Sequence, residues 1–268
     1  MRGIAAGLTS AALALGFGQH VLAAELPVQA APVAAAPAVA PAAVAATWTG
    51  LYIGVNGGGA SQSCPNWTFT SPVTPTTSVN TGCPGLGAVG GLQAGYIWQF
   101  APAWVVGVEG DIAWASLQDH RSLQPAPVLP NGLAAQSLQM TANTQWLSSA
   151  RARAGIVAWN TLWYVTGGAA WARVEYNASG ILVNPLITDT FTTNTTKSGW
   201  VLGGGAQWMA TTNILLSVEY LYYRINSGMS GTAPIAASGV IGVPTGQPVY
   251  TWSGFNVQVA RVAVSYLF

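Results

Sequence analysis

The chain has 268 residues, of which 8 are Lys or Arg and 7 are Asp or Glu. Charged residues make up only 6% of it, against about 25% in soluble domains. This composition excludes an ordinary soluble enzyme, and it excludes a nucleic-acid binder because so few cations cannot build a basic patch. A hydrophobic share of 51% and 12 Trp argue against disorder, which leaves a membrane protein as the leading class.

The N-terminus has the pattern of a secretory signal peptide. A basic start precedes an Ala/Leu-rich stretch over residues 4–15, and small residues follow. We predict a signal peptide over residues 1–23, cleaved after Ala23 or Ala24. The alternative, a retained membrane anchor, is disfavoured because the apolar stretch is shorter than the roughly 20 residues that a spanning helix needs.

Residues 24–46 consist almost entirely of Ala, Pro and Val. Proline at this density prevents a helix and favours an extended chain. We predict a periplasmic linker here, ahead of a domain that covers residues 47–268.

That domain is hydrophobic but contains no apolar stretch long enough for a spanning helix. In a bilayer, only a closed barrel then satisfies all backbone hydrogen-bonding groups. Strands of such a barrel alternate apolar and polar residues with a period of two. Segments of this kind occur over residues 49–61, 86–99, 104–116, 143–157, 162–176, 198–209, 214–226 and 254–268.

The connections between these segments alternate in length. Three are short, over residues 100–103, 158–161 and 210–213. Short periplasmic turns and long extracellular loops are typical of outer-membrane barrels. We therefore predict an all-β fold, an eight-stranded antiparallel up-and-down transmembrane β-barrel like that of outer-membrane protein A. The long connections are predicted as loops over residues 62–85, 117–142, 177–197 and 227–253.

Within the predicted strands, aliphatic residues fall on one face and charged residues on the other. In residues 104–116, for example, Val108 and Ile112 share a face, and Glu109 and Asp111 share the opposite one. Lipid therefore lies outside and the charges point inward. Because buried charges must be paired, we predict an ion-paired network that plugs the lumen; the alternative is a diffusion pore. Its members are Glu109, Asp111, Arg151, Arg153, Glu219 and Arg261.

Two strands are ambiguous at this stage. In residues 254–268 the alternation would place Asn256 and Gln258 toward lipid, which indicates either a β-bulge near Val259 or a position above the bilayer. Residues 162–176 carry small side chains on both faces, so their inward face stays unassigned.

Tryptophans gather near the predicted strand ends, as expected for residues that prefer the headgroup boundary. We predict a periplasmic girdle of Trp98, Trp104, Trp159, Trp163 and Trp208, and an outer girdle of Trp114, Trp146, Trp171 and Trp200.

Several segments, taken in order, resemble the small alphaproteobacterial outer-membrane β-barrel proteins of the opacity-type or porin-family group. They are residues 48–58 (WTGLYIGVNGG), 107–111 (GVEGD), 165–170 (VTGGAA), 219–222 (EYLY) and 261–268 (RVAVSYLF). The last resembles the C-terminal signal read by the barrel-assembly machinery, which implies an assembly role for Val264, Tyr266 and Phe268. The chain departs from the group at Gln207 and Arg224, where acidic residues are common, and at Leu267, where a basic residue is common.

The resemblance implies roles in envelope integrity, contact with host surfaces or, in some members, haemin binding. His120 is the only His of the mature chain and lies in the second predicted loop. It is the candidate haem ligand, although a solvated loop His is the alternative.

The two cysteines, Cys64 and Cys83, both lie in the first predicted loop. An even number of cysteines in an exported protein indicates a disulfide, and we predict one here; two free thiols are the alternative.

We therefore predict a structural or surface-interaction protein of the bacterial outer membrane, with long extracellular loops and a largely plugged lumen. A small porin-like transport barrel, or a haemin- or ligand-binding barrel, is the alternative. We predict no enzymatic activity, catalytic residues, cofactor or metal, since His120 is the only base of its kind left after export. The predicted partners are outer-membrane lipid, the barrel-assembly machinery and a host or surface ligand contacted by the loops, with no nucleic acid, and the protein is predicted to be a monomer.

Overall fold

The computed structural model describes residues 47–63, 66–71, 74–79, 85–123, 135–182, 188–226, 228–232 and 249–268. The predicted signal peptide, its cleavage positions Ala23 and Ala24, and the linker lie outside these ranges, as do Cys64 and Cys83. Within them, no helix has the length and apolar character needed to cross a membrane.

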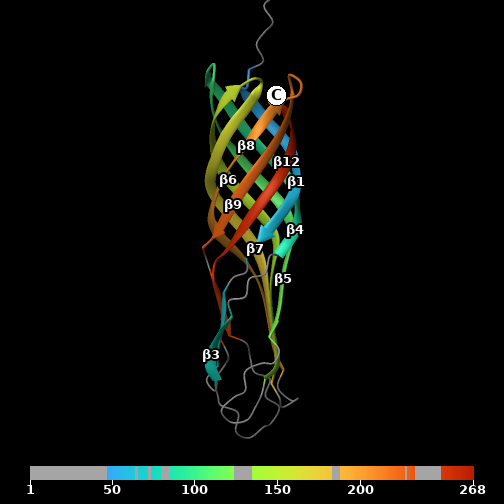
Figure 1. Ribbon diagram of the computed structural model, residues 1–268, viewed down its shortest axis with the longest axis vertical. Helices are drawn as coiled ribbons and strands as arrows, with labels where there is room; N and C mark the ends of the chain where they lie inside the picture. Colours follow the sequence, from blue (N-terminus) through green and yellow to red (C-terminus); the bar gives the residue numbers. More distant parts are fainter. Residues whose placement is uncertain are drawn as a thin grey trace, which may run out of the picture. The chain divides into compact units, whose positions relative to one another are not determined.

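Eight antiparallel strands form a closed barrel (Figure 1). The strand order around the barrel is the sequence order, and the first strand pairs with the last to close the ring. The predicted fold class is confirmed. The strands are β1 (Gly50–Gln62), β4 (Gly85–Ala101), β5 (Trp104–Leu123), β6 (Ala135–Ala158), β7 (Thr161–Leu182), β8 (Thr188–Met209), β9 (Ile214–Ile225) and β12 (Phe255–Leu267).

The three short connections lie where they were predicted, at the end of the barrel that we call the periplasmic end. The tightest joins β6 to β7 through Trp159 and Asn160, whose φ angles are 48° and 63°. Two successive positive φ values are typical of the type I′ turn, whose twist matches that of a β-hairpin. The Asn160 carboxamide also donates a hydrogen bond to the carbonyl oxygen of Met209, at 3.0 Å, which joins this turn to the next hairpin.

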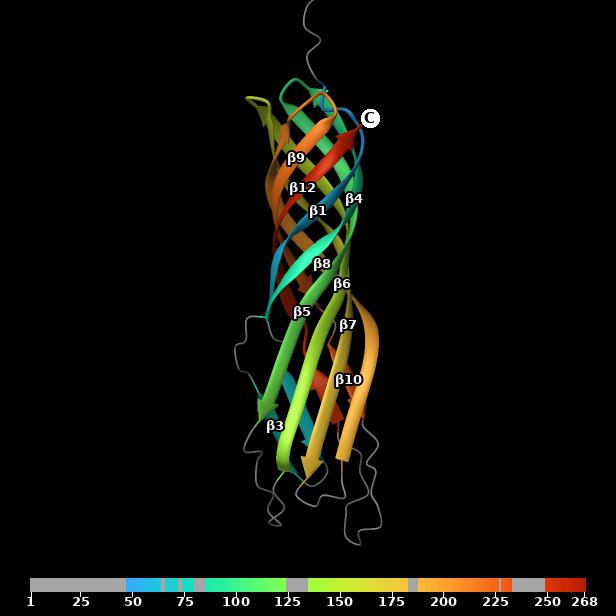
Figure 2. The ribbon, with the colours of Figure 1, turned by 90° about the vertical axis from the view of Figure 1, so that its right-hand side faces the viewer.

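At the opposite end, which we call the loop side, β5 to β8 run well beyond the predicted strands (Figure 2). β5 continues to Leu123, β6 begins at Ala135, β7 continues to Leu182 and β8 begins at Thr188. The predicted loops 117–142 and 177–197 were therefore too long, and His120 lies in strand β5 rather than in a loop. In the described parts of β6, β7 and β8, the outward residues of these continuations are polar, such as Thr141, Asn177 and Thr192. This pattern is opposite to that of the membrane strands, and the sequence analysis therefore did not assign strands there.

The other two long connections contain a second, small sheet. It has four strands in the order β10-β11-β2-β3. The sequence analysis placed loops over these residues, because strands of four to six residues carry too little periodicity to stand out. The strands are β2 (Trp67–Ser71), β3 (Thr74–Val79), β10 (Met229–Thr232) and β11 (Val249–Trp252).

The two ambiguous strands are now assigned. β12 alternates without a register shift against β1 and β9, so the bulge alternative is wrong. Asn256 and Gln258 point outward near the loop side, where Asn256 accepts a hydrogen bond from Arg224 at 2.8 Å. In β7 the even-numbered residues from Leu162 to Ala178, including Thr166 and Ala170, face inward, and all of them except Gly168 are buried.

Candidate functional site

The six charged residues predicted for the lumen lie together inside the barrel, and all are buried. They come from β5, β6, β9 and β12. On these strands an outward aliphatic residue follows or precedes each charge: Val108 is 60% exposed whereas Glu109 is 4% exposed. The period of two thus places carboxylates and guanidinium groups in one layer across the interior.

Arg151 is the centre of the network. Its Nη1 atom lies 2.8 Å from Oε1 of Glu219, and its Nη2 atom pairs with Glu109 and lies 3.3 Å from Oδ1 of Asp111. Arg261 connects the same acids from another strand, at 2.7 Å from Oε2 of Glu219 and 3.2 Å from Oδ2 of Asp111. Each acid is therefore shared by two or more arginines, and the charges of the layer balance.

Arg153 lies at the periplasmic edge of this layer and has a weaker carboxylate contact, at 3.5 Å from Oε2 of Glu109. Its guanidinium group stacks over the ring of Tyr164, 4.0 Å from the ring centroid. It also donates hydrogen bonds to the hydroxyl of Tyr52 at 3.1 Å and to Oε1 of Gln207 at 3.2 Å. Arg153 thus relies mainly on aromatic and amide groups, where Arg151 and Arg261 have close carboxylates.

The sequence analysis missed the uncharged members of the lumen. Asn56 donates to Gln93 at 3.1 Å, and Gln93 donates to Ser265 at 3.2 Å. Ser149 donates to Asp111. Ser149 and Ser265 share the inward parity of the charged residues on β6 and β12, so extending that parity to polar uncharged residues would have found them. β1 and β4 carry no charged residue that could set the parity for Asn56 and Gln93.

Apolar layers cover the charged layer from both sides. Along β9, Leu215 belongs to a periplasmic cluster, Glu219 to the charged layer, and Leu221 to a larger loop-side cluster. β5 repeats the order with Val105, Glu109 and Leu117. Buried side chains therefore lie at three successive levels of the interior. The periplasmic cluster consists of Trp48, Tyr52, Ile97, Val105, Leu162, Tyr164, Met209, Leu215 and Leu267.

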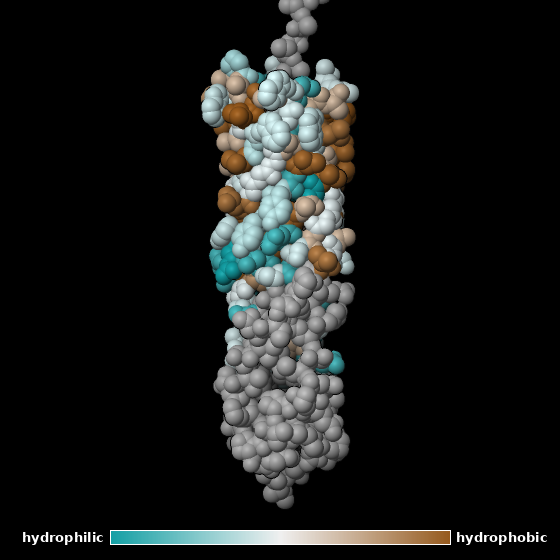
Figure 3. All heavy atoms as spheres, in the orientation of Figure 1, coloured by the Kyte–Doolittle hydropathy of each residue, from teal (hydrophilic) through white to brown (hydrophobic). Residues whose placement is uncertain are grey.

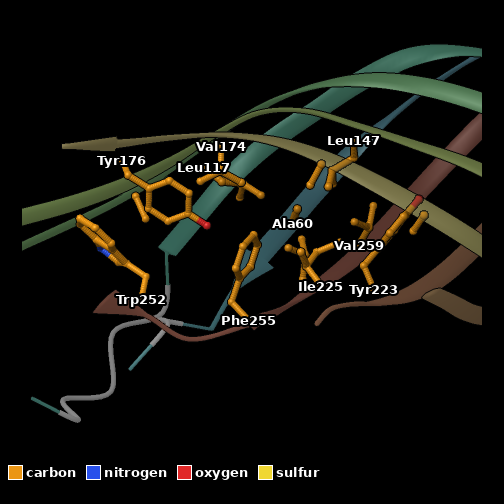
Figure 4. Packing of buried hydrophobic residues seen from close by; sticks show 14 of the residues in the cluster. Ala60, Leu117, Leu147, Val174, Tyr176, Tyr223, Ile225, Trp252, Phe255 and Val259 are labelled. Carbon is orange, nitrogen blue, oxygen red and sulfur yellow. The ribbon is translucent and has the colours of Figure 1, made fainter. Parts of the chain in front are cut away.

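The loop-side cluster extends past the barrel into the space between β7, β8 and the small sheet. Tyr176 packs against Trp252 of β11, with ring centroids 5.1 Å apart (Figure 4). Phe191 of β8 stacks on Tyr250 and Trp252, at 6.5 and 6.0 Å. The small sheet is thus bound to the inward face of the long strands by aromatic contacts.

The outer surface of the barrel is apolar and aromatic. Brown residues are concentrated toward the end that carries the C-terminus, and hydrophilic residues gather at the lower end of the coloured region (Figure 3). All members of the two predicted girdles have exposed rings except Trp146, which is half-buried. A hydrophobic exterior around a charged interior is the arrangement expected of a barrel surrounded by lipid.

Comparisons with known proteins agree with this arrangement. The family described as "Outer membrane protein beta-barrel domain" matches residues 28–268. The chain belongs to this family. It is also 34% identical over 181 residues to the 31 kDa outer-membrane immunogenic proteins of Brucella melitensis and Brucella suis, covering 66% of this chain and 70% of each relative.

Among solved structures, the outer membrane protease OmpT from Escherichia coli is 9% identical, with a TM-score of 0.46, and the match covers 82% of this chain and 97% of that one. Neisserial surface protein A is 13% identical with a TM-score of 0.35, over 82% of this chain and 98% of that one. The family match and the Brucella relatives together place the protein in the bacterial outer membrane. The predicted family and the predicted localisation are therefore confirmed.

The predicted assembly signal of this family member forms an outward row on the last strand. Val264, Tyr266 and Phe268 are all exposed, and the rings of Tyr266 and Phe268 meet edge to face at 4.9 Å between centroids. The intervening Leu267 is buried in the periplasmic cluster. Recognition of the row by the assembly machinery stays a prediction.

The remaining predicted site residues cannot be assigned a role from the structure. Cys64 and Cys83 lie outside the described residues, and so does the side chain of His120. Within the described part of the chain, no three His, Cys, Asp or Glu side chains are grouped so that they could share a metal ion.

Proposed function

We propose that this outer-membrane barrel is a structural and surface-interaction protein, with an interior closed to solute flow and a loop side that contacts molecules outside the cell. The observation that carries the proposal is a layer of six paired charges, balanced in sign, that lies between two clusters of buried apolar side chains in the barrel interior. Opening a path would require separating buried ion pairs, and leaving one partner unpaired costs roughly 3–5 kcal/mol.

The loop side supports the second half of the proposal. Four strands continue beyond the outer girdle, and a second sheet packs against the inward face of two of them, β7 and β8, through Tyr250 and Trp252. A barrel with only a structural role within the bilayer would need neither the strand extensions nor the second sheet. The Brucella relatives are named immunogenic proteins of the outer membrane, which supports surface exposure of the loop side in this chain as well.

Single-channel recording tests the closed interior. The refolded mature chain, in planar lipid bilayers, is expected to give no steady conductance. A variant with Arg151 and Arg261 both changed to Ser leaves Asp111 and Glu219 without an arginine partner. It is expected to admit water and ions, which provides the positive control. A steady large conductance of the wild-type barrel would contradict the proposal and favour the porin-like alternative.

A strain that lacks the gene tests the loop side. It should be compared for detergent sensitivity, haemin use and surface adhesion, and complemented with the wild-type chain or with a chain in which residues 124–134 are replaced by a short Gly/Ser linker. We expect the linker variant to restore detergent resistance but not adhesion. If the linker variant restores adhesion, residues 124–134 are not part of the proposed contact surface.

A further inference from the structure

The outward face of β6, β7 and β8 beyond the outer girdle, which we call the loop-side face, is an ordered grid of polar side chains that are uncharged apart from Glu175. Cross-strand pairing sets its rows: Thr141, Asn177 and Thr192 are neighbours in one row, and Asn143, Glu175 and Asn194 in the next. The carboxylate of Glu175 accepts hydrogen bonds from Gln145 at 2.8 Å and from Asn177 at 3.1 Å. The face thus offers hydroxyl and carboxamide groups at regular spacing.

Two outward arginines mark the base of this face. Arg173 pairs in register with Trp146 on one side and Thr196 on the other. Arg224 pairs in register with Trp200 of the same girdle. Among the side chains that the structure describes, these are the only cations on the outer surface. Both lie beside tryptophans, whose rings prefer the headgroup level of a bilayer.

Arg173 has no hydrogen-bond or ion-pair partner within the described part of the chain. Arg224 donates to the side chains of Asn256 and Asn226, at 2.8 and 3.3 Å, but pairs with no carboxylate there. Two uncompensated guanidinium groups at the headgroup level favour an anionic ligand, and guanidinium groups bind phosphate through two parallel hydrogen bonds.

The extent of the polar grid along the membrane normal can be compared with the thickness of a phospholipid headgroup layer. From Arg173 to Ser179 the strand rises by about 20 Å, or about 14 Å along the membrane normal at a tilt of about 45°. A phospholipid headgroup layer is only about 5–8 Å thick. The grid therefore extends beyond a phospholipid headgroup, and its outward side chains suit the hydroxyl groups of a sugar.

We propose that the loop-side face binds the phosphorylated saccharide headgroup of an outer-leaflet glycolipid. Arg173 and Arg224 contact its phosphates, and the hydroxyl and carboxamide rows above them contact its sugars. This surface adjoins the lipid-contacting surface of the same strands, so one glycolipid molecule can have its acyl chains on the barrel and its headgroup on the grid. The inference goes beyond the proposed function and does not depend on whether the lumen conducts.

The test measures binding of the folded full-length mature protein, in neutral detergent micelles, to four lipids. They are lipid A with its core saccharide, the same lipid after phosphatase treatment, lipid A without the core, and phosphatidylglycerol. We expect the phosphorylated, core-bearing lipid to bind most tightly. Arg173→Gln and Arg224→Gln should each weaken this binding about five-fold, as expected for one basic residue near an anionic lipid surface.

Two further variants separate the parts of the site. Thr192→Ala with Asn194→Ala should weaken binding of the core-bearing lipid and leave binding of lipid A alone unchanged. Lys197→Gln is the matched control, because the Lys197 ammonium group bonds to the carbonyl oxygen of Gly228 instead of facing lipid; it should bind as the wild type does. Circular dichroism checks that each variant keeps its strands.

Three results would overturn the proposal. The first is full affinity of the Arg173→Gln, Arg224→Gln double variant for the core-bearing lipid. The second is equal binding of the dephosphorylated lipid, which removes the role of phosphate. The third is equal binding of phosphatidylglycerol, which removes the role of the saccharide.

Discussion

The long strands reverse their polarity where they leave the membrane. In the barrel part of β6, Arg151 and Arg153 face inward and Ala152 faces outward. In the loop-side part of the same strand, Met140 and Ala142 face inward and are buried, and the outward neighbours are polar. β7 shows the same change from Thr166 to Val174.

The difference shows that the surroundings, and not the strand, decide which face is apolar. Where lipid is outside, apolar side chains face it and polar groups pair inside. Where water is outside, the hydrophobic effect drives apolar side chains to the interior. The change coincides with the outer girdle, and register shifts in β5 after Trp114 and in β6 before Trp146 occur at that level.

The largest expected effect comes from removing a charge from the barrel interior. Arg151→Met removes the guanidinium group that Glu109, Asp111 and Glu219 share and should lower the free energy of unfolding by roughly 3–5 kcal/mol. Urea unfolding of the barrel in micelles, followed by Trp fluorescence, measures the change. Arg151→Lys keeps the charge and should lose less. A loss below about 1 kcal/mol in the Met variant would show that the network contributes little to stability.

A matched pair of substitutions tests the reversal itself. Val108→Arg places a charge on the lipid-facing surface, between the girdle positions Trp104 and Trp114, and should cost roughly 2–4 kcal/mol. Thr192→Arg places the same charge on the outward face of the loop side and should stay within about 0.5 kcal/mol of wild type. Unfolding in lipid vesicles measures both. Equal costs at the two positions would contradict the assignment of lipid to one region and water to the other.

A smaller loss of stability is expected from adding a methyl group to the inner face of β1, and none from adding one to its outer face. A Cβ atom on Gly58 would lie 2.1 Å from the carbonyl oxygen of Ala260, whereas one on Gly59 would meet no atom within 4 Å. Gly58→Ala should therefore lower the free energy of unfolding by roughly 1–3 kcal/mol, as overpacking does. Gly59→Ala should leave it unchanged. If both variants unfold at the same urea concentration, β1 and β12 can separate enough to admit the methyl group.

Much of the barrel could be predicted from the sequence because a bilayer imposes a strict pattern. Apolar and charged residues alternate around Glu109 and Asp111, and again around Arg151 and Arg153. When spanning helices are excluded, this alternation indicates a strand with its apolar face toward lipid and its charged face toward the barrel interior. The short turns were equally clear, since Asn160 and its neighbours interrupt two apolar segments. For the same reason, the six charged residues of the lumen were identified without knowledge of the fold.

The loop side could not be predicted in the same way. The continuation of β7 from Asn177 to Ser179 alternates polar and apolar residues, but a loop of the same composition would have the same local pattern over so few residues. The small sheet depends on contacts such as Tyr176 with Trp252, which join distant segments and leave no local periodicity. Tertiary packing, not local preference, determines these elements.

The pairing of β1 with β12 has a consequence for biogenesis. Tyr52 is paired with Leu267 and Gln62 with Val257, so the seam joins the beginning and the end of the barrel domain. No intermediate length of the polypeptide can complete the ring, and contacts between such distant residues form slowly. The newly made chain must therefore cross the periplasm unfolded, with its aliphatic faces unprotected, and escape aggregation until its final residues arrive at the membrane.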